Sequence, residues 1–416
     1  MKRAFSHVLI LVLLFGGMTA YATGQKEPAP QKSVHLSLIL ITGHDPFQAV
    51  VDNYVKANPG VTVDVQNMPT EQFKTIIKTK FAADDAPDVF PIFNDDESVS
   101  YVKNGYVADL SGMSDVVSRL KTGADSTLRT DTGVLFAFPV EMQLIFMYYN
   151  KDMFKAKGVS IPKTWDDFVA ACKTFMDKGI TPITIGHKDT WTTQMIPYGL
   201  TPAKVHNKDP KFQKDVLKGL KKYADNAGWV DIMSKYEYLL GQGFFNKGSL
   251  GTSFEQSLQM FANGDAAMTP NGTWAMGTIN DMKPAFAVGG FPIPADKADA
   301  PAASASINGG YTVYAKSKNI DSAKKLLAYM VSPAGLSIYL KDKGPAPFKD
   351  VNVSLAPAIN EVIDLEKGMP LYNFDNWAIG VQEVFMKSIQ EMIAGQIHAI
   401  DVLKACDEAT QKALNR

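Results

Sequence analysis

The pattern of apolar positions after residue 33 alternates between strand-like and helix-like segments. The near-continuous apolar run 34–41 is typical of a parallel strand that is buried on both faces. The next segment carries apolar residues at helical spacing and ends at Pro59 and Gly60. The expected order is strand 34–41, helix 47–58, strand 61–68, helix 73–81 and strand 87–93. This order predicts an α/β fold in which right-handed crossovers connect a parallel sheet.

A later stretch, FAFPVEMQLIFMYYNKDMF at residues 136–154, contains a strand-like apolar run that is broken by one carboxylate. β-forming residues fill positions 143–149, and Asn150 is suited to cap the helix that follows. Two interpretations of Glu141 stay open. It is either an exposed residue at a strand edge, or it lies on a strand that crosses between two lobes and faces the cleft between them.

Two further segments interrupt the alternation in the second half. Residues 290–306 are rich in Pro, Ala and Ser and are typical of a second traverse between lobes, and 344–348 form another proline-rich break. GDAAMTPNGTWAM predicts a brief strand, a turn at 270–272 and a helix that starts at Thr273 and Trp274. Other expected elements are helix 150–157, a capped helix that opens at 164–167, strand 180–185, helix 254–261, strand 311–315, a helix around 323–330, and tail helices 375–395 and 400–414.

Length and charge narrow the class of protein. A chain of 416 residues exceeds what one hydrophobic core usually serves, so two domains are expected. The 42 basic and 43 acidic residues give a net charge of −1, which argues against a nucleic acid as partner. The expected division is a first lobe over 34–140, a second lobe over 141–305, a return to the first lobe over 306–345, and C-terminal helices of the second lobe over 346–416.

The N-terminus predicts secretion. Lys2 and Arg3 precede an apolar run at 8–15, and the small residues before position 23 include an Ala-Tyr-Ala site. This is the three-part pattern of a cleavable signal peptide, here 1–22, and the apolar run is too short to span a membrane. Residues 23–33 are then expected to form a flexible leader. No cysteine stands at the cleavage site to receive a lipid, so a free periplasmic protein is expected.

The chain has two cysteines, Cys172 and Cys406, each on the apolar face of an expected helix. Buried free thiols are the first interpretation. Because the expected compartment permits disulfides, a structural bridge is the alternative. A catalytic thiol is disfavoured because neither cysteine has a histidine close to it in sequence.

Polar loops follow the first and third expected strands. In parallel sheets ligands bind at the carboxyl ends of strands, and His44 lies in the first of these loops. Asn94, Asp95 and Asp96 lie in the second loop. These acids either contact a ligand or only cap the following helix and stabilise its first turn. A lone histidine in a loop is often simply solvated.

Three tryptophans are candidates for stacking on a ligand. Trp191 lies in a polar loop after strand 180–185, where either core packing or the C–H face of a sugar ring covers an indole. Trp274 and Trp377 stand at expected helix starts, which offer free N–H donors, and Asn271 adds an amide in the turn before Trp274. A turn followed by a tryptophan in the core explains the residues around Trp274 equally well.

Common catalytic motifs are absent from the sequence. It contains no phosphate-binding glycine loop, no HExxH, no CxxC and no GxSxG. Glu141 and Asp95 are a conceivable carboxylate pair for glycoside cleavage, but the sequence gives no distance between them. A two-lobed secreted protein with carboxylates, amides and tryptophans in its cleft suits the hydroxyls and apolar faces of sugars.

Several segments also resemble one family. MYYNKDMFKAKGVSIPKTWDDFVAACKTF closely resembles the part of family 1 extracellular solute-binding proteins, the sugar receptors of ABC importers, in which a strand leads to an Asn-Lys-Asp helix and a Pro-x-Thr-Trp-x-x-Phe helix. GDAAMTPNGTWAM is similar to a second signature of the family, NPGVTVDV and APDVF match its first lobe, and GYTVYAKSKN and SPAG match its late return. The likeness covers essentially the whole mature chain and is specific to the family, not to a substrate.

The resemblance implies a type II periplasmic-binding fold whose two lobes close on a sugar or oligosaccharide like a hinged trap. It implies a membrane permease and its ATPase as partners of a monomeric receptor with no cofactor, no metal and no catalytic activity. Carry-over by position applies to Trp274 and Glu141. The full set of expected ligand-binding residues is Trp274, Glu141, Trp191, Asn271, Asp95, Asp96, Asn94, Trp377, His44, Asn308 and Asp375.

Three alternatives remain open. The cleft acids suit a cationic ligand such as a polyamine, with the aromatic rings forming a cage around it. A secreted enzyme that acts on a glycoside would use the same carboxylates catalytically. Related folds also include enzymes with a cysteine in the cleft, although both cysteines here are expected to be buried.

Overall fold

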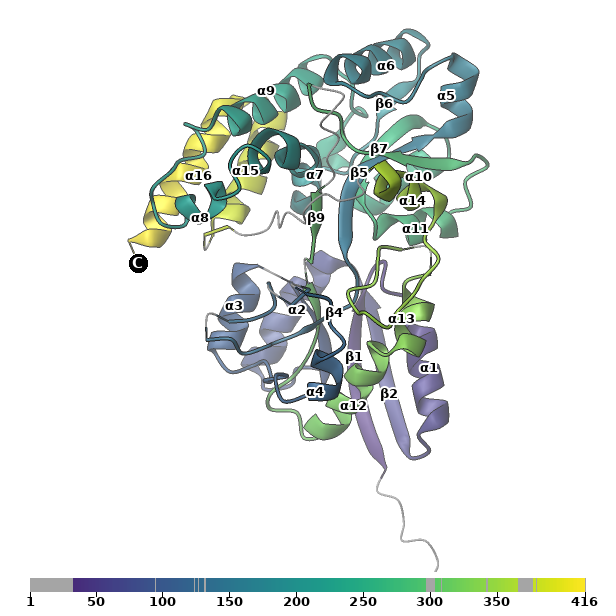
Figure 1. Cartoon of the computed structure of the whole chain (residues 1–416), viewed down its shortest axis with the longest axis vertical. Helices are drawn as coiled ribbons and strands as arrows, with labels where there is room; N and C mark the ends of the chain where they lie inside the picture. Colours follow the sequence, from purple (N-terminus) through teal and green to yellow (C-terminus); the bar gives the residue numbers. More distant parts are fainter. Residues whose placement is uncertain are drawn as a thin grey trace, which may run out of the picture.

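The computed structural model describes residues 33–93, 95–122, 124–125, 127–130, 132–296, 304–307, 309–341, 343–365, 377–378 and 380–415. The expected signal peptide 1–22 lies outside the described residues, as does the expected leader apart from its last residue. The described chain forms two α/β lobes that are joined by extended crossing segments (Figure 1).

The first lobe is built on a five-stranded sheet in the order β2-β1-β3-β10-β4. β1 pairs in parallel with β2 and β3, as the alternating pattern predicts. β10 comes back from the second lobe and is antiparallel to β3 and β4, so the complete sheet is mixed. The elements are β1 (Val34–Ile41), α1 (Phe47–Ala57), β2 (Val61–Met68), α2 (Thr70–Ala82), β3 (Val89–Phe93), α3 (Asp96–Lys103), α4 (Ser114–Val117), β4 (Phe138–Pro139), β10 (Gly309–Val313), α12 (Ile320–Met330) and α13 (Pro333–Tyr339).

The second lobe contains a sheet in the order β6-β7-β5-β8, with β9 also paired to β5. Helices cover it, and α15 and α16 pack against α9 at one end (Figure 1). The strands are β5 (Gln143–Asn150), β6 (Thr181–Ile183), β7 (Ala266–Gly272), β8 (Val288–Phe291) and β9 (Ser304–Ser306). The helices are α5 (Lys151–Lys157), α6 (Trp165–Asp177), η1 (Thr190–Gln194), α7 (Met195–Thr201), η2 (Pro202–His206), α8 (Phe212–Val216), α9 (Ala227–Gly241), η3 (Ser249–Gly251), α10 (Phe254–Ala262), α11 (Ala275–Asp281), α14 (Pro357–Leu365), α15 (Val381–Ile393) and α16 (Ala399–Leu414).

β5 has an unbroken apolar sequence because both of its faces are buried. Alternate side chains of a strand point to opposite faces of the sheet. Ile145 and Met147 pack into the hydrophobic cluster on one face, whereas Phe146 and Tyr148 pack into the cluster on the other. The strand ends at Asn150, whose side chain accepts a hydrogen bond from the Met153 N–H and caps α5, as predicted.

Three extended segments cross between the lobes and form the hinge. The first runs from β4 into β5, and the second runs from β9 into β10 beside it, with Gln143 paired to Ser306. The third follows α13, where the Met142 N–H donates to the Pro345 carbonyl over 2.8 Å. Gly344 lies so close to the first segment that a Cβ atom there would be 2.2 Å from the Met142 carbonyl oxygen, which requires glycine.

The return to the first lobe is longer than the sequence pattern indicates. Ala346, Phe348 and Val351 pack into the hydrophobic cluster of the first lobe, beyond the expected boundary at 345. Leu355 and Ala356 are the first later residues that pack in a cluster of the second lobe. The proline-rich segment therefore contributes to both lobes, because its apolar side chains carry no periodicity that assigns them to either one.

Two local predictions are wrong. The turn expected at 270–272 is the end of β7, where Asn271 pairs with Phe146 of β5. Pairing with a central strand outweighs the turn preference of Pro-Asn-Gly. The tail helix expected from residue 375 begins at Val381 among the described residues.

Both cysteines are buried and free, as predicted, and burial raises the pKa of each thiol.

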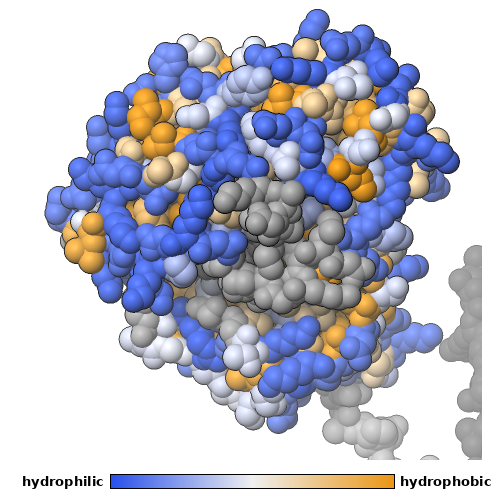
Figure 2. Space-filling model, turned by 45° about the horizontal axis from the view of Figure 1, so that its top comes forward, coloured by the Kyte–Doolittle hydropathy of each residue, from blue (hydrophilic) through white to orange (hydrophobic). Residues whose placement is uncertain are grey.

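The visible face of the molecule in Figure 2 is mostly polar outside its grey residues. On the face drawn in Figure 2, hydrophilic residues predominate and hydrophobic residues form small separate patches. None of the helices in the described part of the chain combines the length and apolar character needed to cross a bilayer.

Candidate ligand-binding cleft

A cleft lies between the lobes and is bounded at its base by the first crossing segment. Its empty volume is about 1330 Å³, including the open solvent at its mouth. The first lobe contributes the carboxyl ends of β1 and β3 and the start of α2, as expected for this sheet. The second lobe contributes η1, the starts of α10 and α11, and α15.

Two tryptophans form an aromatic wall on the second lobe. Trp191 and Trp274 are half-buried, and their rings meet edge to face with centroids 6.1 Å apart. Phe254 supports Trp191 at a centroid distance of 4.9 Å. The Trp274 ring lies against the backbone of Gly272, where a Cβ atom would be 2.0 Å from the ring. Both indoles line the cleft and thus offer apolar surface to a ligand.

Glu141 lines the base of the cleft and is only 2% exposed. Its Oε2 accepts a hydrogen bond from the Tyr339 hydroxyl over 3.4 Å. Its Oε1 has no hydrogen-bond partner among the described residues. Burial raises the pKa of the Glu141 carboxyl group. This rise is opposed by the positive charge of Lys343 and by side-chain hydrogen bonds with Gln143 and Tyr339. Of the two sequence interpretations, the structure has the one in which Glu141 crosses between the lobes and faces the cleft, although residues 140–142 are a link between β4 and β5 and not part of a strand.

Lys343 is buried in the hinge, next to this carboxylate. Its Nζ donates to the Gly43 carbonyl and lies 5.0 Å from the centroid of the Tyr339 ring. Burial lowers the pKa of Lys343, although the attraction of Glu141 opposes this. Burial and the nearby ammonium together lower the pKa of His44 to about 3, so this imidazole is neutral at pH 7. His44 lines the cleft, and its Nδ1 lies 2.9 Å from the Tyr311 hydroxyl.

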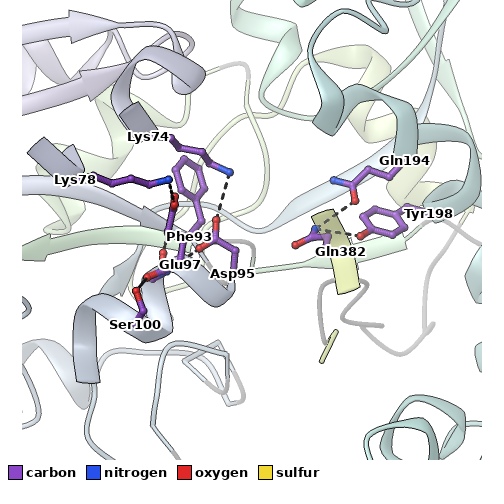
Figure 3. Close-up of polar contacts among 10 residues, drawn as sticks. Lys74, Lys78, Phe93, Asp95, Glu97, Ser100, Gln194, Tyr198 and Gln382 are labelled. Carbon is purple, nitrogen blue, oxygen red and sulfur yellow. Dashed lines mark hydrogen bonds and ion pairs between the residues drawn. The ribbon is translucent and has the colours of Figure 1, made fainter. Parts of the chain in front are cut away.

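Polar side chains from both lobes line the cleft farther from the hinge (Figure 3). On the first lobe, Asp95 caps α3 by accepting from the Ser98 N–H over 2.9 Å and forms an ion pair with Lys74 at 3.4 Å. Asp95 therefore fits both sequence interpretations, since it is a helix cap that also lines the cleft. On the second lobe, the Gln382 Nε2 donates to the Gln194 Oε1 over 3.2 Å.

The cleft carries more acidic than basic groups. Among its described lining residues, Lys74 is the one lysine and there is no arginine, whereas five residues carry carboxylates: Glu71, Asp95, Glu141, Asp189 and Glu255. The Asp189 carboxylate accepts the Phe254 N–H at the start of α10 over 2.6 Å. Such a site favours neutral or cationic ligands over anions.

The structure places two predicted ligand contacts away from the cleft. Asn271 is buried, and its Oδ1 accepts the N–H of Gly272. Trp377 stacks on Tyr223 and Phe385 at centroid distances of 5.1 and 4.9 Å, and its Nε1 donates to the Tyr198 hydroxyl. Neither is among the residues that line the cleft, so these two predictions are corrected. Trp377 instead packs against the hydrophobic cluster of the second lobe.

Other predicted contacts lie beyond what the structure describes. Asn94, Asn308 and Asp375 are outside the described residues, and Asp96 is the first residue of α3 with an undescribed side chain. Several lining residues have no counterpart in the sequence prediction: Glu71, Lys74, Gln143, Asp189, Gln194 and Gln382. Gln143 was detectable, because it is two residues from Glu141 in an extended segment and so shares its face.

Comparison with known proteins assigns the chain to a family. The family model described as "Bacterial extracellular solute-binding protein" matches residues 41–336. The chain belongs to this family. Its relatives include the multiple sugar-binding protein of Streptococcus mutans, which is 27% identical over 313 residues that cover 73% of this chain and 72% of the relative. The melibiose/raffinose/stachyose-binding protein MelE of Bacillus subtilis is 22% identical over 341 residues, covering 80% and 78% of the two chains.

Solved structures of solute-binding proteins share the fold. A chitin oligosaccharide binding protein superposes with a TM-score of 0.79 at 21% identity, covering 91% of this chain and 99% of the other. RafE in complex with raffinose gives a TM-score of 0.76 at 23% identity, with the same coverage. The type II periplasmic-binding fold expected from the sequence is thus confirmed.

His187 is a buried histidine at the start of the loop that carries Trp191, and its burial predicts how the stability of the fold depends on pH. His187 has its Nδ1 2.9 Å from the Ser249 Oγ and its Nε2 2.7 Å from the Tyr236 hydroxyl. Burial lowers its pKa to about 3. Below pH ~6.5 the unfolded chain binds a proton that the folded imidazole does not, which costs about 1.4 kcal/mol of stability per pH unit.

We therefore expect His187→Gln to lose less stability than the wild type between pH 7.5 and pH 5.0, as measured by urea unfolding. His35→Gln, at an exposed position on β1, is the matched control and should follow the wild type. Equal losses in all three proteins would contradict the role of His187.

Proposed function

We propose that this protein is the substrate-binding receptor of an ABC importer and captures a neutral oligosaccharide between its lobes. The observation that carries the proposal is the pair of half-buried indoles, Trp191 and Trp274, which line the same cleft as polar side chains from both lobes. Sugar rings combine apolar C–H faces with hydroxyl edges, which matches this arrangement. The names of the sugar-binding relatives support the same ligand class.

Hinged closure is the proposed mechanism. A ligand that contacts both lobes binds the closed state more tightly, so it shifts the population toward closure. The closed receptor then delivers the sugar to a membrane permease that is driven by an ATPase. We propose that the protein acts as a monomer in the periplasm, after removal of the signal peptide.

A catalytic role is disfavoured by the groups that the cleft offers. Both thiols are buried with raised pKa values, so neither is an activated nucleophile. The Asp95 carboxylate is engaged by the Ser98 N–H and by Lys74, which argues against its pairing with Glu141 in glycoside cleavage. The excess of carboxylates keeps one second candidate, a cationic solute such as a polyamine.

A thermal-shift screen of the mature protein tests the proposal. The probes are raffinose, stachyose, maltotriose, chitotriose, spermidine and sn-glycerol 3-phosphate. Binding to the folded state stabilises it by about 4 kcal/mol at a thousandfold excess over Kd, so a ligand should raise the melting temperature clearly. We expect a shift with one class of neutral oligosaccharide. A shift with spermidine alone would favour the cationic candidate, and no shift with any neutral sugar would contradict the proposal.

A further inference from the structure

Two side chains of the first crossing segment face the base of the cleft together. Residues two apart in an extended segment point to the same side, and both Glu141 and Gln143 line the cleft. Met142, which lies between them, does not face the cleft. Its N–H donates a hydrogen bond to the Pro345 carbonyl, and its side chain packs against the hydrophobic cluster of the first lobe. The backbone of the hinge therefore fixes both polar side chains toward the ligand space.

Each of these side chains carries a buried oxygen without a partner. The Glu141 Oε1 and the Gln143 Oε1 make no hydrogen bond among the described residues, although almost all buried polar atoms in proteins are paired. An unpaired buried acceptor costs about 1–3 kcal/mol. A ligand that donates hydrogen bonds to these oxygens would remove this cost, which makes them a source of affinity.

The chemistry of these oxygens restricts the ligand. Both are acceptors, so they pair with donors such as sugar hydroxyls and oppose phosphate or carboxylate groups, which offer acceptors at pH 7. The buried Lys343 already attracts this carboxylate and offsets part of the cost of its burial, which weakens the case for a cationic ligand at this end of the cleft. Hydroxyl donors without net charge therefore fit this end of the cleft best.

Building on the proposed sugar-receptor function, we propose that Gln143 and Glu141 form a paired acceptor site at the hinge that takes two hydroxyl donors of one neutral sugar ring and disfavours acidic or phosphorylated sugars. The pair lies on the hinge itself, where the two lobes move least relative to each other. The two acceptor oxygens are thus available to a ligand in the open state. They hold one sugar ring first, and the side chains farther from the hinge contact the remaining rings when the lobes close.

Gln143→Met tests the site, because methionine keeps the length of the side chain and removes the acceptor. The probe is whichever of raffinose, stachyose, maltotriose or chitotriose binds the wild type most tightly, with Kd measured by titration calorimetry. We expect Gln143→Met to weaken this sugar about tenfold, as loss of one good hydrogen bond predicts. The melting temperature of the free variant should change little, because the variant loses the buried unpaired oxygen together with the amide that stabilises the Glu141 carboxylate. Gln396→Met, at an exposed turn, is the matched control and should bind like the wild type.

The outcomes separate this site from the receptor function. Unchanged sugar affinity in Gln143→Met, with a wild type that binds the sugar, would overturn the acceptor site and leave the receptor function standing. A wild type that binds sn-glycerol 3-phosphate more tightly than every neutral sugar would overturn the selectivity against anions. A wild type that binds none of the neutral sugars would instead refute the proposed capture of a neutral oligosaccharide.

Discussion

Trp274→Ala is expected to weaken sugar binding by about 30-fold or more. A buried aromatic anchor at a binding site typically accounts for at least about 2 kcal/mol, and 1.4 kcal/mol corresponds to tenfold in Kd. Trp274 meets Trp191 edge to face on the wall of the cleft, so its loss also leaves the second indole without lateral support. Titration calorimetry with the sugar found in the screen measures the effect.

The fold should survive this change with a moderate loss of stability. The Trp274 ring covers the Gly272 backbone and packs against both clusters of the second lobe, so the free protein should lose about 1–2 kcal/mol. Trp274→Phe is the matched variant, because it keeps an aromatic ring near Gly272 and should recover most of the stability and part of the affinity. A collapse of the melting temperature with unchanged affinity in the remaining folded protein would mean that Trp274 is purely structural.

Lys343→Met is expected to lower the free energy of unfolding by about 3 kcal/mol at pH 8. The Lys343 ammonium and the Glu141 carboxylate are buried and attract each other without forming a direct ion pair. Breaking a direct buried pair typically costs about 3–5 kcal/mol, so the lower end of this range is expected here. Here the remaining charge would be Glu141, whose pKa burial already raises. The variant also loses the hydrogen bond from Nζ to the Gly43 carbonyl, which joins the third crossing segment to the loop after β1.

The dependence on pH identifies the cause of this loss. A carboxyl group whose pKa is raised by folding contributes stability below its unfolded pKa of about 4.5 and loses it as the pH rises through the folded pKa. Without Lys343 the folded pKa of Glu141 rises further, so the destabilisation should be larger at pH 8 than at pH 5. Urea unfolding at both pH values measures this difference.

A double variant supplies the control for the charge pair. Glu141→Gln combined with Lys343→Met should recover part of the lost stability and remove the extra dependence on pH. Lys341→Met, at an exposed position, should have little effect at either pH. If the double variant is as unstable as the sum of the two single variants, the attraction between Glu141 and Lys343 is not the cause.

The sequence by itself determined the elements and the architecture of this protein. Apolar periodicity located β1, α1 and β2, and Asn150 marked the start of α5, because these signals depend on neighbours a few residues away. The single carboxylate in the apolar run marked Glu141 as either an exposed edge residue or a cleft residue at the crossing between the lobes, and the structure has the second. The order of strands and helices then predicted two α/β lobes.

Only the tertiary structure decided which side chains share the cleft. Asn271 and Trp377 have the same local signals as Trp274, yet β7 extends through Asn271 and a cluster of aromatic rings encloses Trp377. Lys343 and Gln382 come from segments whose position against the hinge and the cleft no local pattern encodes. A cleft between lobes brings together residues separated by hundreds of positions, and its membership follows from strand register and helix packing, which are long-range properties of the folded chain.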